Sequence, residues 1–371
     1  MLPKLLVIAG TRPEVIKVAP IVRSLQKTTW AEVRLVLTGQ HARVITPLLE
    51  HFGVVANSIL PIERRSGSLP ELTGAIAIGF GDFIEQERPD GIIVQGDTTS
   101  AMVAAVCGFL CRIPVFHVEA GLRSNDLQHP FPEEFNRRVV SLATTKHFVP
   151  TINSRSNLLR EGIHANDIFV VGNTVIDALL WTLNSISPGP SCFENPGFKI
   201  LVTCHRRESW DGGIASICEA IKIISDRIPC ASILFPVHPN PNVEQTVKKS
   251  LGQKDRITLC SPLDYATFCR AMKESDLIIS DSGGVQEEAL ALGRPTLVTR
   301  DVTERPEVLN WETVRLVGTN TDKIVREALR MHEDREHYAR CSIPGFPFGE
   351  GDTAERITRH LHEFFRFTRK G

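Results

Sequence analysis

The feature that most constrains the fold is a repeated alternation of continuous apolar segments with amphipathic segments. Leu5-Leu-Val-Ile-Ala9 is apolar on both faces, and the segment that follows, to about Lys27, carries apolar residues at helical spacing. The same order recurs at the strands predicted for residues 33–38 and 91–96. Strands that are apolar on both faces and alternate with amphipathic helices form parallel sheets covered on both sides.

A chain of 371 residues is too long for one ordinary core and predicts two domains. The Pro/Gly/Ser cluster at 185–191 is typical of an interdomain linker. We predict an α/β fold of two Rossmann-like, doubly wound parallel-sheet domains, at residues 1–184 and 197–352, facing a cleft. The final helix, within residues 353–371, is expected to pack back on the first domain. The strands of the second domain are predicted at 199–203, 232–237, 257–259, 277–280 and 295–299.

Composition excludes several classes of protein. The net charge of -1 gives no basic surface for nucleic acid. Apolar runs stay below about 18 residues, so no membrane span is predicted. The apolar segment at the start of the sequence has no signal-peptide cleavage site and is predicted as a strand. The nine cysteines show no C-x-x-C and no known zinc spacing. Reduced thiols in a cytoplasmic protein without a bound metal are expected.

Two acids are predicted at one edge of the first sheet. Glu119 ends an apolar strand beginning at Val115, and Glu133 lies in the first turn of a helix. A buried carboxylate without a partner costs several kcal/mol, which favours a functional role. Two structural alternatives stay open, namely an ion pair of Glu119 with Arg123 and a surface pair of Glu133 with Arg137.

The segment from Ser280 to Glu288 predicts an anion site. Ser282 suits a helix N-cap, and Gly283 and Gly284 leave backbone amides open at the helix start, where they favour a diphosphate. Glu288 is placed to accept ribose hydroxyls. A plain capped helix is the structural alternative. G-x-G-x-x-G and Walker motifs are missing, which argues against a dinucleotide cofactor and phosphoryl transfer.

Three further loops at strand ends carry polar residues. Arg12 and Lys17 could reach phosphates or form a solvated pair, and His205 with two arginines suggests an anion clamp or an ion-pair cluster with a neighbouring glutamate. Asp97 is equally well explained as a site acid and as the N-cap of the next helix. His117 should share a face with Glu119, but no further metal ligand is evident beside it.

Assembled, these motifs resemble the non-hydrolysing UDP-N-acetylglucosamine 2-epimerase family over nearly the whole chain. The matching segments are Gly-Thr-Arg-Pro-Glu at 10–14, Gly-Asp-Thr-Thr at 96–99, His-Val-Glu-Ala-Gly-Leu-Arg at 117–123, Pro-Glu-Glu and Asn-Arg at 132–137, Gly-Asn-Thr-Val-Ile-Asp at 172–177, His-Arg-Arg-Glu at 205–208, Asp-Ser-Gly-Gly-Val-Gln-Glu-Glu at 281–288 and Thr-Glu-Arg-Pro-Glu at 303–307.

The resemblance implies a glycosyltransferase-B-like fold and reversible conversion of UDP-GlcNAc to UDP-ManNAc through 2-acetamidoglucal, with no cofactor and no metal. A homodimer is expected. The catalytic roles implied fall on Asp97, Glu119, Glu133 and His205. The substrate-binding roles implied fall on Arg12, Lys17, Arg137, Phe268, Ser282, Gly283, Gly284, Glu288 and Arg315.

Departures from the family pattern leave one question open. Gln40, Arg206 and His238 match a second, activating UDP-GlcNAc site, but Gln-His-Ala-Arg at 40–43 departs from the usual Gln-His-Arg. The segment at 72–75 also lacks an arginine often used there, whereas Phe131 in place of tryptophan or tyrosine is conservative. Four alternatives in function remain: a hydrolysing epimerase, an epimerase of a UDP-diacetamido-uronic acid, a glycosyltransferase of this architecture and a nucleotide-sugar sensor.

Overall fold

The structure is a computed structural model that describes residues 2–40, 42–63, 66–187, 189–204, 212–252 and 254–368. The chain forms two compact units. Unit 1 comprises Met1–Trp181 together with Phe348–Gly371, and unit 2 comprises Thr182–Pro347. None of the helices in the described residues is both long and apolar enough to cross a membrane.

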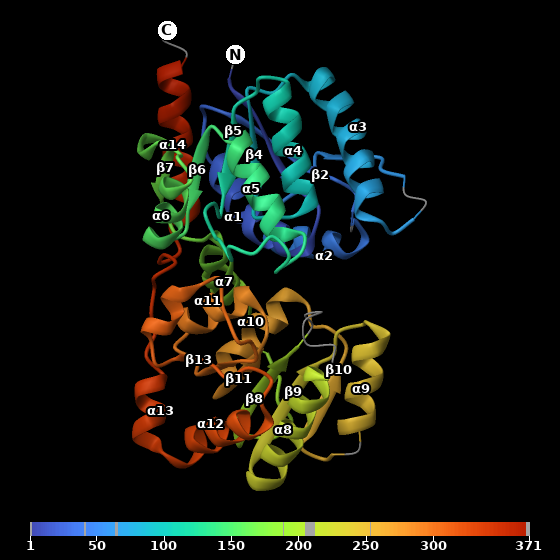
Figure 1. Cartoon of the computed structure of the whole chain (residues 1–371), viewed down its shortest axis with the longest axis vertical. Helices are drawn as coiled ribbons and strands as arrows, with labels where there is room; N and C mark the ends of the chain where they lie inside the picture. The colour runs from blue at the N-terminus through green and yellow to red at the C-terminus, as the bar shows by residue number, and fades with distance from the viewer. Residues whose placement is uncertain are drawn as a thin grey trace. The chain divides into compact units, whose positions relative to one another are not determined.

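Unit 1 is built on a seven-stranded parallel sheet in the order β3-β2-β1-β4-β5-β6-β7 (Figure 1). Its strands are β1 (Lys4–Ala9), β2 (Glu32–Leu37), β3 (Ser58–Ile59), β4 (Gly91–Gln95), β5 (Val115–Val118), β6 (Lys146–Val149) and β7 (Ile168–Val170). The central strands β4 and β5 are buried along their whole length, as expected for a sheet covered on both faces. The chain runs outward from β1 in one direction and from β4 in the other, so the predicted doubly wound parallel sheet is confirmed.

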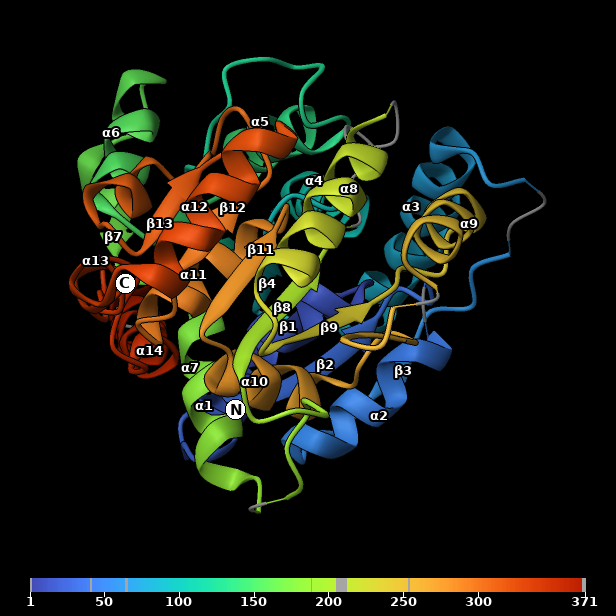
Figure 2. The same cartoon turned by 90° about the horizontal axis from the view of Figure 1, so that it is seen from below.

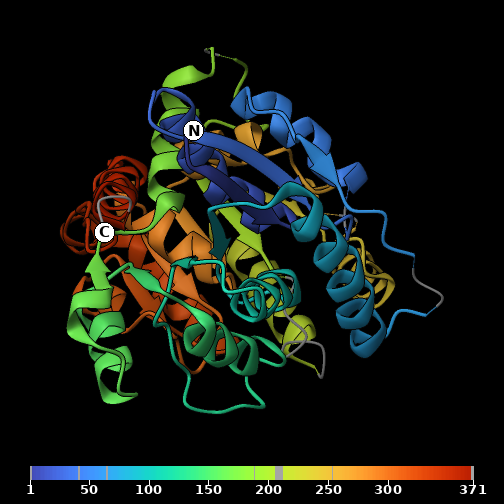
Figure 3. The same cartoon turned by 90° about the horizontal axis from the view of Figure 1, so that it is seen from above.

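Helices cover both faces of this sheet, with α3, α4 and α5 in a row on one face (Figure 3, where they run from blue through teal to green). The last helix of the chain, α14, packs against α1, and Phe364 and Phe365 meet Phe116 of β5. The helices of unit 1 are α1 (Arg12–Gln26), α2 (Ala42–Phe52), α3 (Leu69–Glu87), α4 (Thr99–Leu110), α5 (Glu133–Ala143), α6 (Ile152–Arg160), α7 (Thr174–Ser185, which continues into unit 2) and α14 (Thr353–Thr368).

Unit 2 repeats the plan with a six-stranded parallel sheet in the order β10-β9-β8-β11-β12-β13 (Figure 2). The strands are β8 (Phe198–Thr203), β9 (Ala231–Pro236), β10 (Ile257–Cys260), β11 (Leu277–Ser280), β12 (Thr296–Val298) and β13 (Val314–Leu316). The helices are α8 (Gly213–Arg227), α9 (Pro241–Leu251), α10 (Tyr265–Glu274), α11 (Gly283–Ala291), α12 (Thr321–Glu333) and α13 (Arg335–Cys341). The sixth strand, β13, extends the sheet beyond the five predicted strands.

The strand order reverses at the same place in both units, between β1 and β4 in unit 1 and between β8 and β11 in unit 2. In open α/β sheets, ligands bind beyond the carboxyl ends of the strands at such a switch point. The loops that leave these four strands begin at Gly10, Gly96, Cys204 and Asp281. All four belong to the loops that the sequence singled out.

Candidate active site

In unit 1, the site is organised around Glu119, directly after β5. Glu119 is only 6% exposed. Nζ of Lys17, on α1, lies 2.5 Å from Oε2 of Glu119. Gln95, the last residue of β4, donates to the same oxygen, and Nδ2 of Asn173 donates to Oε1 over 3.1 Å. One cation and two amides therefore fix the carboxylate in one orientation.

The alternative that Arg123 neutralises Glu119 is wrong. The guanidinium group of Arg123 donates to both carboxylate oxygens of Glu161 at 2.7 Å, and also to Ser141 and to the carbonyl of Leu122. The cation beside Glu119 is Lys17, which reaches it from a different element.

The backbone of Glu119 is in the left-handed region, with φ +62°. A residue with a side chain held there costs of order 1–3 kcal/mol, and such strain clusters at functional sites. The conformation turns the chain sharply at the strand end, with Gly121 following at φ +82°. A Cβ on Gly121 would lie 2.3 Å from the carbonyl oxygen of Ser154, so this turn requires glycine.

Asp97 lies in the loop after β4 and is paired with Arg137 of α5. The N-cap of α4 is Thr98, whose hydroxyl accepts from the amide of Ala101 at 3.0 Å. The alternative of Asp97 as N-cap is therefore wrong, and its carboxylate is directed to α5 instead. Glu133, half-buried, is the first residue of α5.

Glu134 is a structural acid that the sequence did not single out. It is completely buried in the first turn of α5 and accepts from the amides of Ser124 and Asn125 at 3.0 and 3.3 Å. Arg137 and Arg138 also donate to it, at 3.2 and 3.1 Å. Glu134 thereby ties the loop after Glu119 to the helix that carries Glu133.

Glu14 joins two of the loops at the switch point. It is 1% exposed, and burial raises its pKa while its hydrogen bonds act in the opposite direction. Oε2 accepts from the amides of Gly10 and Thr11 at 3.0 and 2.7 Å, which completes a capping box at the start of α1. Oε1 accepts from the hydroxyl of Thr98 at 2.7 Å, so the loops after β1 and β4 are held together.

His117 is buried between β4 and β6, and burial lowers its pKa to about 4. Its Nε2 lies 2.8 Å from the carbonyl oxygen of Gly96, the residue before Asp97. The neutral ring therefore carries its proton on Nε2 and donates to that carbonyl. His117 therefore positions the loop of Asp97.

In unit 2, the predicted anion site lies at the start of α11. Ser282 is the N-cap residue, as predicted, although its hydroxyl makes no capping hydrogen bond within the described part of the helix. Gly283 and Gly284 form the first helical positions. A Cβ on Gly283 would lie 2.5 Å from Nη1 of Arg305, so the guanidinium group of Arg305 approaches the backbone of Gly283 closely.

Glu288, further along α11, is 5% exposed and accepts a hydrogen bond from the hydroxyl of Tyr265 at 3.0 Å. Tyr265 begins α10, and Phe268 is half-buried one turn later on the same helix. Burial raises the pKa of Tyr265 well above its usual value, so the phenol stays protonated and donates. Tyr265 was not singled out in the sequence, because tyrosine at a helix start carries no motif of its own.

A buried cluster of ion pairs lies beside the start of α11. Arg305 pairs with Glu287 of α11, and its Nη1 lies 2.7 Å from Oε1 of Glu304. Arg300 lies 2.7 Å from the same glutamate through Oε2. Two arginines and two glutamates balance in charge, which is the condition under which buried ions are tolerated.

The remaining predicted residues are placed as follows. Arg12 is the first residue of α1. Gln40 accepts from the hydroxyl of Ser100 at 3.2 Å, and His238 accepts from the amide of Asn240 at 3.2 Å. His205 and Arg206 lie outside the described residues. The activating site assigned to Gln40, Arg206 and His238 stays a prediction.

Arg315 lies within β13. Its ion pairs with described residues do not involve the first turn of α11. Nη1 is 3.2 Å from Glu327 of α12, and Nη2 is 3.6 Å from Glu312 before β13. Both contacts are ion pairs within unit 2. A role for Arg315 in binding nucleotide is therefore a prediction that these contacts do not favour.

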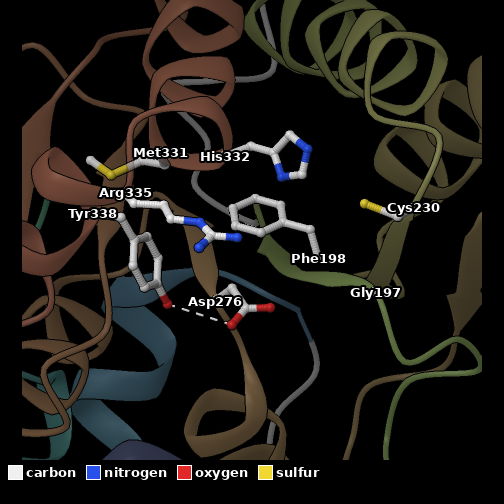
Figure 4. A pocket seen from close by; sticks show the side chains of 8 residues that line it. All are labelled: Gly197, Phe198, Cys230, Asp276, Met331, His332, Arg335 and Tyr338. Atoms are coloured by element: carbon white, nitrogen blue, oxygen red, sulfur yellow. Dashed lines mark hydrogen bonds between the residues drawn. The ribbon is translucent and has the colours of Figure 1, made fainter.

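A separate pocket of about 470 Å³ lies at the amino ends of the strands of unit 2 (Figure 4). Phe198 and His332 line it, with ring centroids 5.1 Å apart, together with Arg335 and Tyr338 of α13. The hydroxyl of Tyr338 makes a long hydrogen bond of 3.5 Å to Asp276. This pocket is at the opposite edge of the sheet from the start of α11.

Comparisons with known proteins agree with this arrangement. The family model described as UDP-N-acetylglucosamine 2-epimerase matches residues 23–362. The chain is 44% identical over 368 residues to the UDP-N-acetylglucosamine 2-epimerase of Yersinia pestis, covering 96% of this chain and 98% of that protein.

Two solved structures are similar along their whole length. The UDP-GlcNAc 2-epimerase of Neisseria meningitidis, bound to UDP-GlcNAc, is 37% identical with a TM-score of 0.91, covering 97% of this chain and 100% of that one. The enzyme of Methanocaldococcus jannaschii, in complex with UDP-GlcNAc and UDP, is 34% identical with a TM-score of 0.82, covering 97% and 99%. The predicted glycosyltransferase-B-like fold is thus confirmed. The chain belongs to the UDP-N-acetylglucosamine 2-epimerase family.

Proposed function

We propose that the protein converts UDP-GlcNAc reversibly to UDP-ManNAc without hydrolysing the nucleotide sugar. The observation that carries the proposal is the carboxylate of Glu119, held by Lys17, Gln95 and Asn173 at the end of β5 in a strained backbone conformation. A strained, buried acid that is fully oriented by donors is a group prepared for proton transfer.

The proposed reaction is an elimination followed by an addition. A carboxylate takes the proton from C2 while the bond between C1 and the diphosphate oxygen breaks, and the electron pair of the C2–H bond forms the C1–C2 double bond of 2-acetamidoglucal. UDP then adds back to C1, and an acid returns a proton to the other face of C2. Glu119, Glu133 and Asp97 are the proposed acid/base residues of unit 1.

The proton at C2 is only weakly acidic, so a base alone contributes too little. General acid–base catalysis gives roughly 10²–10⁴-fold, whereas one well-placed donor to a developing anion is worth about 3–4 kcal/mol. We assign stabilisation of the leaving diphosphate to the amides of Gly283 and Gly284 at the start of α11, and to His205. Glu288, held by Tyr265, is assigned to the ribose.

Incubation with UDP-GlcNAc in D₂O, followed by NMR, tests the proposal. A mixture of UDP-GlcNAc and UDP-ManNAc with deuterium at C2 and no free sugar is expected. Release of free ManNAc and UDP would instead show a hydrolysing epimerase. Transfer of the sugar to an acceptor without exchange at C2 would show a glycosyltransferase. Absence of any change, with UDP-GlcNAc bound, would show a sensor.

We also propose that the protein is a homodimer through the helices α3, α4 and α5. Ile78, Phe109, Leu110 and Leu142 on these helices are between 60% and 80% exposed, and a second copy that covered them would remove apolar surface from water. Leu142→Asp is expected to give a monomer by light scattering, whereas Val302→Asp, at a 72% exposed position in unit 2, should leave the dimer intact. A monomeric wild-type protein would contradict this assignment.

A further inference from the structure

Three potential metal ligands meet at α13 of unit 2, in a cluster formed by Glu312, His337 and Cys341. One ligand atom from each residue lies within 4.8 Å of the other two. His337 and Cys341 are four residues apart on α13 and therefore share one helix face. They are 1% and 0% exposed, whereas Glu312, just before β13, is exposed. The buried pair thus has a solvent-accessible third member.

The separation of the two buried groups matches a metal site. Sγ of Cys341 lies 3.6 Å from Nε2 and 3.9 Å from Nδ1 of His337. In a tetrahedral zinc site, with Zn–S about 2.3 Å and Zn–N about 2.0–2.1 Å, the sulfur and nitrogen ligands lie about 3.6 Å apart.

Charged side chains of both signs surround the cluster. Arg315, Arg330 and Arg340 face it from β13, α12 and α13. Against these stand Asp334, which precedes α13, Glu327 of α12 and Glu312 itself, which lies 3.6 Å from Arg315 and 3.7 Å from Arg340. At His337 the three arginines act against a positive charge and Asp334 acts for it, so a cation is favoured here only together with its own anionic ligands, the Glu312 carboxylate and a Cys341 thiolate.

The two buried ligands differ in protonation. Metal coordination uses a neutral imidazole and a thiolate, whereas a free cysteine thiol carries its proton at neutral pH. A metal must therefore displace the thiol proton, so its affinity increases with pH.

We propose that Glu312, His337 and Cys341 form a binding site for zinc or a similar borderline-soft divalent cation, with the fourth position open to water. Nitrogen, sulfur and carboxylate oxygen from three residues, plus water, form a ligand set that zinc accepts. The ion would connect α13 to the start of β13 and so stabilise unit 2. The site is independent of the proposed epimerase reaction.

The experiment is a titration of the chelator-treated full-length protein with Co²⁺, read by absorption. Co²⁺ bound to Cys341 gives a thiolate-to-cobalt charge-transfer band in the near ultraviolet, together with visible bands of a tetrahedral ion, at one equivalent per chain. Zn²⁺ should displace the cobalt and abolish both sets of bands. The apparent affinity should increase between pH 6 and pH 8.

Variants separate this site from the other eight cysteines. Cys341→Ser should abolish the charge-transfer band, whereas Cys230→Ser, at an exposed cysteine, should leave it unchanged. Glu312→Gln, at an exposed position that does not threaten folding, should weaken Co²⁺ binding more than about 10-fold, since loss of even an outer-shell partner costs about 10–100-fold. Absence of a band in the wild-type protein, or a band that survives Cys341→Ser, would overturn the proposal.

Discussion

Nζ of Lys17, on α1, lies 2.5 Å from Oε2 of Glu119, at the end of β5, and joins two residues 102 positions apart in the sequence. The side chains are 14% and 3% exposed. Removing one partner of a buried pair leaves an uncompensated charge, which costs about 3–5 kcal/mol. The pair is therefore a structural requirement of unit 1 as well as a part of the proposed site.

Lys17→Met is expected to lower the free energy of unfolding by about 3 kcal/mol, because the Glu119 carboxylate stays buried without its cation. The double variant Lys17→Met/Glu119→Gln should lose less than the sum of the single variants, by about 1–3 kcal/mol. Urea unfolding followed by tryptophan fluorescence measures all three. Lys248→Met, in the exposed pair with Glu244, is the control and should change stability by less than about 0.5 kcal/mol. Additive single losses would contradict the coupling.

Glu119→Gln is expected to abolish both epimerisation and incorporation of deuterium at C2. The nucleotide is assigned to unit 2, so the affinity for UDP should stay within a few-fold of the wild type. NMR in D₂O and calorimetry with UDP measure the two quantities on one preparation. Glu50→Gln, on the exposed face of α2, is the control and should keep full activity. An active Glu119→Gln protein would remove this residue from the mechanism.

Stability is expected to fall as the pH decreases from 6.5 towards 4. Burial lowers the pKa of His117 to about 4 and that of His147 to about 3, against about 6.5 in the unfolded chain. Between these values the unfolded state binds protons that the folded state does not, so lowering the pH favours unfolding. At pH 5 each histidine contributes a loss of about 2 kcal/mol relative to pH 7.

His147→Phe tests this origin, because it removes one of the two titrating groups. The decrease in unfolding free energy between pH 7 and pH 5 should become smaller by about 2 kcal/mol in urea titrations. His129→Phe, at an exposed histidine, is the control and should leave the decrease unchanged. An unaltered pH dependence in His147→Phe would exclude the buried histidines as its cause.

Gly10→Ala is expected to destabilise unit 1 by about 1–3 kcal/mol, the usual cost of overpacking. The added Cβ would lie 2.1 Å from Oγ of Ser100 and 2.4 Å from Oγ1 of Thr38, whose hydroxyls are hydrogen bonded at 2.8 Å. Gly74→Ala is the matched control, since nothing lies within 4 Å of its Cβ on α3. It should raise stability by roughly 0.5–1 kcal/mol. Thermal melts that shift in opposite directions would agree with both expectations.

Tyr265→Phe is expected to weaken UDP binding by roughly 5-fold, since one hydrogen bond contributes about 1 kcal/mol. The variant keeps the ring in place and removes only the donor to Glu288. The chain has two tyrosines, and Tyr338→Phe is the matched control. Tyr338 lines the pocket at the amino ends of the strands, whereas α11 begins at their carboxyl ends. Calorimetry with UDP compares them. Equal affinities in all three proteins would contradict the assignment of Glu288 to the nucleotide.

Most of the fold could be predicted from the sequence because buried parallel strands are continuous apolar runs. The predicted strand at 277–280 coincides with β11, and the predicted helix after Ala9 coincides with α1 to within a residue. β13 was missed because it has only three residues and carries Arg315 at its centre. A short strand with a charged residue gives neither an apolar run nor a clear alternation.

The site was harder to predict, because spacing in sequence identifies candidate acids but not their partners. Arg123 lies four residues from Glu119, yet it binds Glu161, and the lysine that pairs with Glu119 comes from α1. Likewise, His337 and Cys341 have no metal spacing of a known family, and Glu312, which is distant in sequence, joins them only in the folded chain. Long-range partners of this kind follow from tertiary packing and leave no local pattern.

The return of α14 to unit 1 has a consequence for biosynthesis. Phe364 and Phe365 complete the packing around Phe116, but the ribosome makes them only after all of unit 2. Unit 2 is contiguous in sequence and can fold as soon as it emerges from the ribosome, although the translation of unit 1 begins first. During synthesis the apolar face that α14 covers stays exposed, so the nascent first half is the part of the chain that chaperones have to protect.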